Sequence, residues 1–215
     1  MKVRGASGKK SGPRRTARVI SLVAVCALAA EAACAQQAGA PDALVSAGQI
    51  TVNGHAVPYR IRHLPVSSFP ALPPAVSAVL TAKNCLIPQT YEARQPENVV
   101  HGSFEKAGSQ DWAALCSAGG RVSLMVFFAS ALDKPVMLSS LPETARLQPR
   151  DLSGSLGFAW AIDVATPEQI HDKQIGMTPR PPRLDHDALA DSDLRPDTVY
   201  RYFSNRTWTR VDTAE

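Results

Sequence analysis

The stretch Asn98–Ser130, NVVHGSFEKAGSQDWAALCSAGGRVSLMVFFAS, is the most strongly patterned part of this chain of 215 residues. Residues Asn98–Phe104 come first, and their side chains would alternate between the two faces of a strand. A turn rich in Gly and Ser follows, and Asp111–Cys116 leads through Gly119-Gly120 into Val122–Phe128. This order predicts three consecutive antiparallel strands. The third is almost wholly apolar, which indicates burial on both faces, whereas the polar alternation of the first two indicates one wetted face each.

A hairpin is expected upstream of this stretch. Gln49–Val52 and Val57–Arg62 flank Asn53-Gly54, a dipeptide typical of tight turns between antiparallel strands. Pro58 lies within the second run. Because proline has no N–H for the ladder, we expect that run to be an edge strand.

A helix is expected between the hairpin and the patterned stretch. The segment Pro65–Pro74 holds prolines at 65, 70, 73 and 74, which predicts an extended connector. Pro74 suits the first turn of a helix that runs to about Lys83. The buried stripe of this helix consists of Val76, Val79 and Leu80.

Less regular sequence follows Ser130. It predicts a long loop with one short strand at Val136–Leu138 and then a further strand at Gly157–Val164. Thr166–Gln169 has the Thr, Pro and Gln of a capping box, so a short helix is expected to begin there.

The last part of the chain combines a loop and a hairpin. Thr178–Pro196 is polar and rich in proline, and Thr198–Phe203 with Thr207–Val211 predicts an aromatic hairpin. The expected fold class is therefore α+β and β-rich, an antiparallel sheet with one or two packed helices. We expect one such domain over residues 49–215, preceded by a flexible lead-in at 36–48.

The N-terminus has the pattern of a secretory leader. Residues 1–18 are basic and rich in turn formers, and Val19–Ala30 is uncharged and too short to span a bilayer comfortably. Small residues at the positions that a signal peptidase reads place cleavage between Ala35 and Gln36. The sequence thus predicts a Sec signal peptide over residues 1–35 and a periplasmic or secreted protein.

Two other export routes fit the leader less well. Lipid attachment at Cys34 is disfavoured because Glu31 lies where a lipobox needs an aliphatic residue. A twin-arginine signal at Arg14-Arg15 is disfavoured because Ala17 and Arg18 follow where hydrophobic residues are needed.

Removal of this leader changes the charge of the chain. Residues 1–35 hold seven of the 23 Lys and Arg and one of the 19 Asp and Glu, which leaves 16 basic against 18 acidic residues. The near-neutral remainder gives no electrostatic argument for nucleic acid as a partner. The most apolar later segment, Val122–Phe128, has the length of a strand and not of a transmembrane span.

Two cysteines follow the leader, Cys85 and Cys116. In an oxidising compartment two thiols in one small domain most often pair, and the alternatives are buried free thiols or a metal pair. Closing the 30 intervening residues would stabilise the fold by about 3 to 4 kcal/mol on the loop-entropy model. The absence of CxxC spacing argues against a redox-active site.

Four segments resemble a group of uncharacterised exported bacterial proteins. The likeness covers most of the chain from Pro73 onward. Both cysteines fall inside its motifs, so the resemblance supports the disulfide, and it implies no activity. The segments are Cys85–Gln89, Asn98–Phe104, Asp111–Ser117 and Leu184–Leu189.

A second resemblance is confined to one short frame. Gly102-x-Phe104 followed by Gly108-x-x-Asp111 is similar to a single unit of the FG-GAP or VCBS propeller repeat. The turn at 105–108 lacks the Asp and Asn ligands that bind calcium in those repeats, and no second copy follows.

The acidic segment 185–193 is the candidate metal site. Carboxylates and imidazole are ligands that calcium or zinc accepts, and they would serve a metal-dependent hydrolase. The spacing departs from an EF-type loop, since no Gly occurs and Leu189 interrupts the acids, so a solvated loop whose aspartates cap turns is favoured. The candidate ligands are Asp185, His186 and Asp187, with Asp191 and Asp193 beyond them.

No catalytic residue or cofactor is assigned from the sequence. There is no GxSxG or SxxK motif, and the five histidines show no HExxH or HxH spacing. Enzymatic activity stays open, and a non-enzymatic exported protein of the cell envelope that binds an unidentified envelope or extracellular ligand is favoured. Its expected ligand surface, for a carbohydrate or peptide, is aromatic and basic, although strand aromatics also serve as core. That surface comprises Tyr59, Arg60, Arg62, Tyr200, Tyr202 and Trp208.

Overall fold

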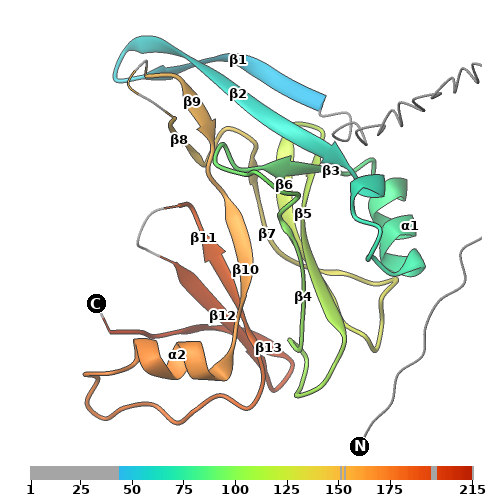
Figure 1. Cartoon of the computed structure of the whole chain (residues 1–215), viewed down its shortest axis with the longest axis vertical. Coiled ribbons are helices and arrows are strands. Elements are labelled where there is room, and N and C mark those ends of the chain that lie inside the picture. Colours follow the sequence, from blue (N-terminus) through green and yellow to red (C-terminus); the bar gives the residue numbers. More distant parts are fainter. Residues whose placement is uncertain (1–43, 151, 153, 195–197, 215) are drawn as a thin grey trace, which may run out of the picture. The chain divides into compact units, whose positions relative to one another are not determined.

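The computed structural model describes residues 44–150, 152, 154–194 and 198–214. The predicted signal peptide, residues 1–35, and residues 36–43 of the predicted lead-in lie outside the described residues. Within the described part, thirteen strands form two sheets and two α-helices accompany them (Figure 1). The chain is β-rich and contains both helices and antiparallel sheets, as the sequence predicts.

Nine strands form the first sheet. Neighbouring strands are antiparallel, except that β2 and β9 are parallel. Two strands lie off the main path, since β1 (Leu44–Val52) pairs with β2 and β4 (Val99–Gly102) pairs with β5. The path itself runs β7 (Val136–Pro142), β6 (Arg121–Phe127), β5 (Asp111–Ala118), β3 (Leu86–Gln89), β2 (His55–Pro65), β9 (Leu156–Phe158) and β8 (Leu147–Pro149).

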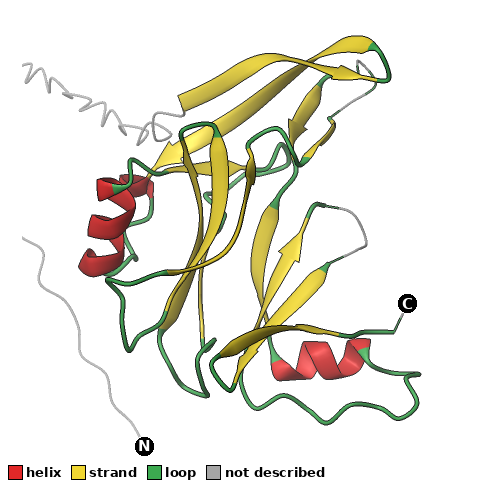
Figure 2. Cartoon of the chain, turned by 180° about the vertical axis from the view of Figure 1, so that it is seen from behind, coloured by secondary structure: helices red, strands yellow, loops and turns green. Residues whose placement is uncertain are grey.

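Four antiparallel strands form the second sheet, and a short helix lies beside them (Figure 2). Helix α2 (Pro167–Lys173) begins with the predicted capping box, in which the side chains of Thr166 and Gln169 each accept a hydrogen bond from the other's backbone N–H. Ile170 is fully buried in a small core between this helix and the sheet. The strands are, in order, β10 (Ala161–Ala165), β11 (Ala188–Ser192), β12 (Val199–Ser204) and β13 (Thr207–Val211).

The three strands predicted within Asn98–Ser130 are confirmed as β4, β5 and β6, with antiparallel pairing. The expectation of one wetted face for β5 is wrong, because every residue of Ala113–Ser117 is buried. Leu115 faces the main core, which both sheets share, whereas Cys116 faces a second core under the first helix. Both faces of β5 are covered because the chain packs a helix on one and the second sheet on the other.

The predicted upstream hairpin is β1 and β2. Asn53 and Gly54 have φ angles of 51° and 81°, the left-handed conformation that a type I′ turn requires. Pairing begins at Leu44, so it includes residues 44–48 that the sequence assigned to the lead-in. The expectation of an edge strand is wrong, because β2 pairs with β1 on one side and with β9 and β3 on the other. Pro58 is tolerated because it lies outside the β9 and β3 pairings, where β2 has only β1 as its neighbour.

Helix α1 (Pro74–Ala82) and the disulfide are present as predicted. The connector before the helix holds a short 3₁₀ turn at Val66–Ser68, and Pro74 occupies the first turn of the helix. Cys85 follows the helix and is bonded to Cys116 of β5, with a Cα–Cα distance of 5.0 Å. Both cysteines are buried in the second core, so the bond links the helix to the centre of the first sheet.

The segment predicted as one strand at Gly157–Val164 is divided between the two sheets. β9 ends in the first sheet and β10 begins in the second, and Trp160 lies between them with an exposed fraction of 1%. The Asn98 amide secures this crossing, since it donates to the carbonyls of Pro88 (2.8 Å) and Trp160 (3.0 Å). Its oxygen accepts from the N–H of Ile162 at 3.0 Å. One buried side chain thus satisfies backbone groups at the place where strand pairing changes.

The predicted loop at Thr178–Pro196 contains strand β11, which the sequence did not indicate. The segment ALADS lacks the β-branched and aromatic residues that strands favour. Its neighbours β10 and β12 hold it in place by pairing on both sides. Tertiary pairing therefore overrides a weak local preference.

Candidate functional site

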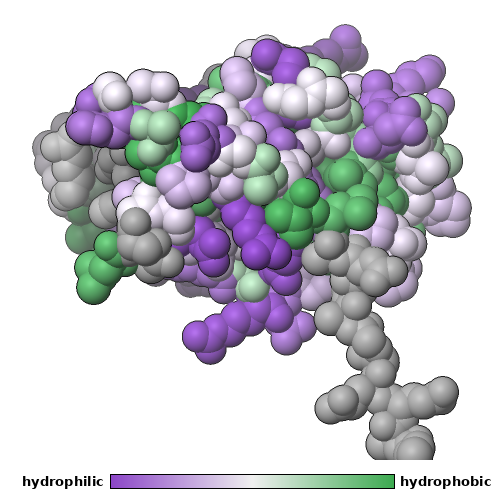
Figure 3. Space-filling view, turned by 90° about the horizontal axis from the view of Figure 1, so that it is seen from above, coloured by the Kyte–Doolittle hydropathy of each residue, from purple (hydrophilic) through white to green (hydrophobic). Residues whose placement is uncertain are grey.

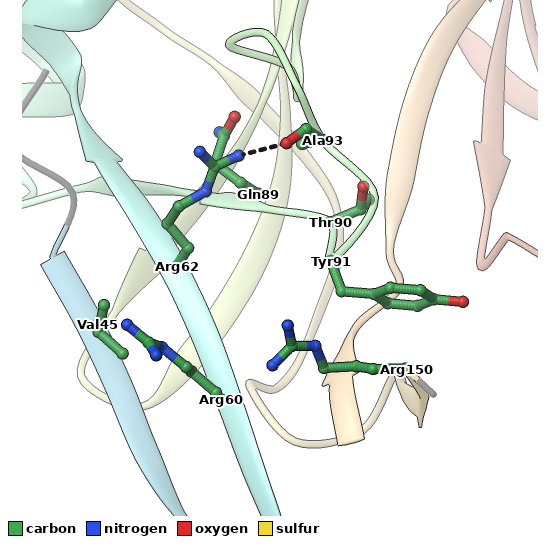
Figure 4. A pocket seen from close by; sticks show the side chains of 8 residues that line it. All are labelled: Val45, Arg60, Arg62, Gln89, Thr90, Tyr91, Ala93 and Arg150. Atoms are coloured by element: carbon green, nitrogen blue, oxygen red, sulfur yellow. Dashed lines mark hydrogen bonds between the residues drawn. The ribbon is translucent and has the colours of Figure 1, made fainter. Parts of the chain in front are cut away.

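A pocket of about 300 Å³ lies where two strands share one edge of β2 (Figure 4). β9 pairs with β2 at Tyr59 and Arg60, and β3 takes over the same edge from Arg62 onward. The two pairings do not overlap, so the neighbour of β2 on this edge changes from β9 to β3 at the pocket. The lining residues are Val45, Arg60, Arg62, Gln89, Thr90, Tyr91, Ala93 and Arg150.

Strand alternation brings the first two arginines together. Arg60 and Arg62 are two residues apart in β2, so their side chains lie on the same face of the sheet. Tyr59 lies on the opposite face, where it packs against the main core. Val45 of β1 is the cross-strand neighbour of Arg62 and adds an apolar side chain to the pocket.

The third arginine comes from the other side of the pocket. Arg150 follows β8, and its guanidinium group points toward β2 (Figure 4). The aliphatic part of Arg150 lies over Gly157 of β9. A Cβ at Gly157 would come within 2.6 Å of the Cγ of Arg150 and within 2.5 Å of the Cβ of Tyr91. Gly157 therefore allows two lining residues to approach the strand closely.

The rim formed by the loop after β3 is held by buried hydrogen bonds. Gln89, 1% exposed, donates to the carbonyl of Glu97 (3.0 Å) and accepts from its N–H (2.9 Å). The carboxylate of Glu97 accepts from the N–H of Thr90 at 2.6 Å, so this acid is turned to the loop backbone. The N–H of Tyr91 donates to the carbonyl of Phe158 at 2.9 Å. Hydrogen bonds within the protein thus hold the rim in place.

The pocket carries positive charge without an acidic counterpart in its described lining. Arg62 donates to the carbonyl of Ala93 at 2.9 Å, a bond that orients the guanidinium group without neutralising it. Among the described residues, Arg60 and Arg150 have no hydrogen-bonding or ion-pair partner for their side chains. Three guanidinium groups around one space repel each other, which favours the entry of an anion.

The other half of the predicted ligand surface lies elsewhere. Tyr200, Tyr202 and Trp208 belong to the second sheet, and none of them lines the pocket. Tyr200 is 9% exposed and packs in the small core, and Trp208 stacks with Phe128 at a centroid distance of 6.1 Å. Of the six predicted residues, the structure brings only Arg60 and Arg62 into one site.

The candidate metal ligands are engaged with protein groups. Tyr202 donates a hydrogen bond to Asp185, and its ring stacks on His186 at a centroid distance of 4.4 Å. Burial and this bond raise the pKa of Tyr202 to about 12, and the same bond lowers the pKa of Asp185. Asp187 accepts from the N–H of Ser103 at 2.9 Å. Over the described ranges, no three His, Cys, Asp or Glu side chains are grouped so that they could hold a metal ion.

Asp191 of the same segment has a different position. Its carboxylate is fully buried, and one oxygen accepts from Arg146 (2.6 Å) and from the indole N–H of Trp160 (2.8 Å). The other oxygen accepts from Arg201 at 3.0 and 3.2 Å. Each carboxylate oxygen thus accepts two hydrogen bonds from protein groups. Asp191 therefore ties the two sheets together and is not available to a ligand.

Buried Ser117 and His63 also meet a partly buried acid, Glu143, but not in the order that nucleophilic catalysis needs. Glu143 accepts from Ser117 (2.5 Å) and pairs with Nε2 of His63 (2.6 Å) through the same oxygen. In a catalytic triad the imidazole lies between the hydroxyl and the acid. Here the acid lies between them, and His63 is 2% exposed, so the group stabilises the fold through hydrogen bonds.

Comparisons with protein-family models, with curated proteins and with solved structures find no match for this chain. Within the part of the chain that the structure describes, none of the helices has the length and apolar character to cross a membrane. The choice of the arginine pocket, defined by Arg60, Arg62 and Arg150, as the candidate site therefore rests on its geometry alone.

Sequence reasoning found two of the three arginines. The sequence placed Arg60 and Arg62 on one predicted ligand surface, whereas nothing local to Arg150 pointed to them. Gly157 carried a usable signal, because a glycine inside a predicted strand often marks a close approach of other atoms.

Proposed function

We propose that this chain is an exported cell-envelope protein that binds an anionic ligand in the arginine pocket and carries out no chemistry on it. The observation that carries the proposal is the meeting of Arg60, Arg62 and Arg150 around a space of about 300 Å³ whose described lining contains no acid. Such a volume matches the lower range of small-molecule sites.

Binding is favoured over catalysis by what surrounds the arginines. The described lining offers guanidinium groups, one glutamine, one threonine, one tyrosine and apolar surface. In Figure 4 the ring of Tyr91 points away from the pocket. No His, Cys or carboxylate among the described lining residues could act as a nucleophile or transfer a proton near neutral pH.

Export to the periplasm or beyond the cell is part of the same proposal. The leader pattern in residues 1–35 supports it, and so does the Cys85–Cys116 bond, since structural disulfides persist in oxidising compartments. The near-neutral charge expected after cleavage also fits a local anion site better than a broad basic surface.

Titration calorimetry on the mature chain tests the binding function. Benzoate and phenyl phosphate should release heat on binding, whereas phenol, a neutral molecule with the same ring, should not. Affinity should fall as salt is added, because Arg60 and Arg150 are exposed.

Matched substitutions locate the binding. Arg150→Gln should weaken binding of the anion about tenfold, which corresponds to about 1.4 kcal/mol of binding free energy. Arg210→Gln removes an exposed arginine of β13 and should change nothing. Absence of binding by every anion, or equal binding in the Arg150 variant, would contradict the proposal.

A further inference from the structure

We infer that the ligand of the arginine pocket is a phosphate monoester, that is, a phosphoryl group attached to an organic molecule. This inference rests on the anion-binding function proposed above. Four features of the pocket lead to this ligand class: the number of its charges, the directions from which they come, its size and its apolar rim.

The number of charges favours a dianion. Three guanidinium groups face a described lining without a carboxylate, so a single carboxylate group would leave two of them unneutralised. A phosphate monoester carries a charge between about −1.5 and −2 near neutral pH. It also concentrates that charge on three oxygens in one group, which matches three donors around one space.

The directions of the donors favour a tetrahedral group. Arg60 and Arg62 project from β2, and Arg150 projects from the residue after β8. In Figure 4 the Arg150 guanidinium group points toward β2, the Arg62 group toward Ala93 and the Arg60 group toward Val45. A planar carboxylate accepts paired N–H bonds mainly within its own plane, whereas the oxygens of a phosphoryl group point in several directions. Donors that line one space and point in different directions therefore suit phosphate better.

The size of the pocket indicates more than a free ion. A volume of about 300 Å³ is roughly ten times the share that one water molecule takes in the liquid, so a phosphoryl group alone leaves much of it unfilled. The remaining space would accept the organic part of an ester.

The rim of the pocket offers a contact for that organic part. Val45 lines the pocket, and its side chain is 45% exposed. Figure 3, a view of the molecule from above, shows hydrophobic residues beside hydrophilic ones on the surface. An anionic group attached to an apolar body would use both kinds of surface.

Competition between two ligands of the same ring tests the phosphoryl group. Calorimetry with the mature chain should show phenyl phosphate binding at least about tenfold more tightly than benzoate. Inorganic phosphate should bind more weakly than phenyl phosphate, because it leaves the rest of the pocket empty. Arg150→Gln should remove most of the preference for phenyl phosphate, and Arg210→Gln should preserve it.

A second arm distinguishes a membrane lipid from a soluble ester. Co-sedimentation with phosphatidylcholine vesicles that contain phosphatidic acid, and not with phosphatidylcholine alone, would identify a lipid headgroup as the source of the phosphoryl group. Binding of phenyl phosphate without vesicle binding would identify a soluble ester. Both results support phosphoryl recognition.

Three outcomes would overturn the inference. Benzoate binding as tightly as phenyl phosphate would remove phosphoryl recognition and leave the proposed anion-binding function in place. A preference for phosphate that survives Arg150→Gln would place recognition outside this pocket. Failure of both anions to bind would remove the inference together with the proposed function.

Discussion

Glu143 is the side chain whose ionisation most clearly depends on the fold. The hydrogen bond with His63 is the largest cause that lowers the pKa of this carboxyl, burial opposes it, and bonds from Ser117 and Ser46 add to it. The four residues come from β1, β2, β5 and the turn after β7. One carboxylate therefore connects three strands and a turn.

Replacement of Glu143 should change how stability depends on pH. Because the folded-state pKa lies below the ordinary value of 4.5, the carboxylate stabilises the fold above that pH and loses this effect as the pH falls through the folded-state pKa. Glu143→Gln should lower the free energy of unfolding by about 1 to 3 kcal/mol at neutral pH. The difference from the wild type should shrink below pH 4.5.

Urea unfolding followed by circular dichroism at several pH values measures this difference. Glu92→Gln, at an exposed position in the loop after β3, is the matched control and should follow the wild-type curve. A Glu143→Gln curve that stays parallel to the wild type from neutral to acidic pH would show that the carboxylate does not carry the acid dependence.

At the scale of elements, helix α1 depends on its covalent link to β5. The helix has nine residues, too few to be stable alone, and it buries Val76 and Leu80 against the sheet. The Cys85–Cys116 bond adds to this contact by restricting the unfolded chain.

Loss of the disulfide should therefore be costly. We expect Cys85→Ser or Cys116→Ser alone to lower the free energy of unfolding by about 2 to 5 kcal/mol, and expression in a reducing compartment to give poorly folded protein. Mass spectrometry of the exported, non-reduced chain after alkylation measures the pairing. Two alkylated thiols in the folded mature chain would refute it.

Gly157 positions the third arginine through the packing of β9. An added methyl group would collide with Tyr91 and Arg150, so Gly157→Ala should displace both side chains. The affinity for phenyl phosphate should fall about tenfold, although the charge of the pocket does not change. In an Arg150→Gln background the same change should cost little affinity, because the guanidinium group whose position it disturbs is already absent.

Calorimetry on the two single variants and the double variant gives the coupling between these positions. Additive losses would mean that Gly157 acts on binding independently of Arg150. An unchanged affinity in the glycine variant would mean that the pocket can absorb the added methyl group.

At the scale of the whole molecule, the two sheets are joined by a shared core and one buried charge cluster. Trp160 and Leu189 enter the same core as Leu115 and Leu124 of the first sheet. Asp191 of β11 adds a charged link to Arg146, which lies between β7 and β8. The second sheet is thus held by apolar contact and by a carboxylate that has no access to water.

Neutralising Asp191 should loosen this junction. Asp191→Asn keeps the volume but leaves two arginines and an indole N–H without their full partner, and we expect a loss of about 3 to 5 kcal/mol in the free energy of unfolding. Asp133→Asn, at an exposed position, is the control and should cost almost nothing. Equal urea midpoints for both variants would show that the cluster contributes no net stability.

Export is the remaining property of the whole chain to be measured. Expression of the full sequence in a bacterium with a Sec pathway should yield a periplasmic or secreted product that begins at Gln36. Intact-mass measurement of the fractionated protein reads the cleavage site directly. A full-length product in the cytoplasm would contradict the leader, and a lipidated product at Cys34 would contradict the predicted route.

Local sequence was enough to determine the features that depend on neighbouring residues. The Asn53-Gly54 turn, the capping box at Thr166–Gln169 and the start of α1 at Pro74 each follow from conformational preferences of a few adjacent residues. The same holds for Arg60 and Arg62, because alternation along one strand fixes which side chains share a face. The predicted leader and the predicted disulfide rest on composition and cysteine count; the structure bears out the disulfide, and the leader stays a prediction.

Tertiary structure alone decided which of these pieces meet. Whether β2 is an edge, whether β5 has a wetted face and whether ALADS is a strand depend on the neighbours that long-range pairing supplies, which local periodicity does not specify. Arg150 reaches the other arginines only because β9 runs beside β2 and has a glycine at the point of contact. The candidate site consequently lies at a junction of strands, and the identity of strand neighbours is fixed by the energy of the whole fold.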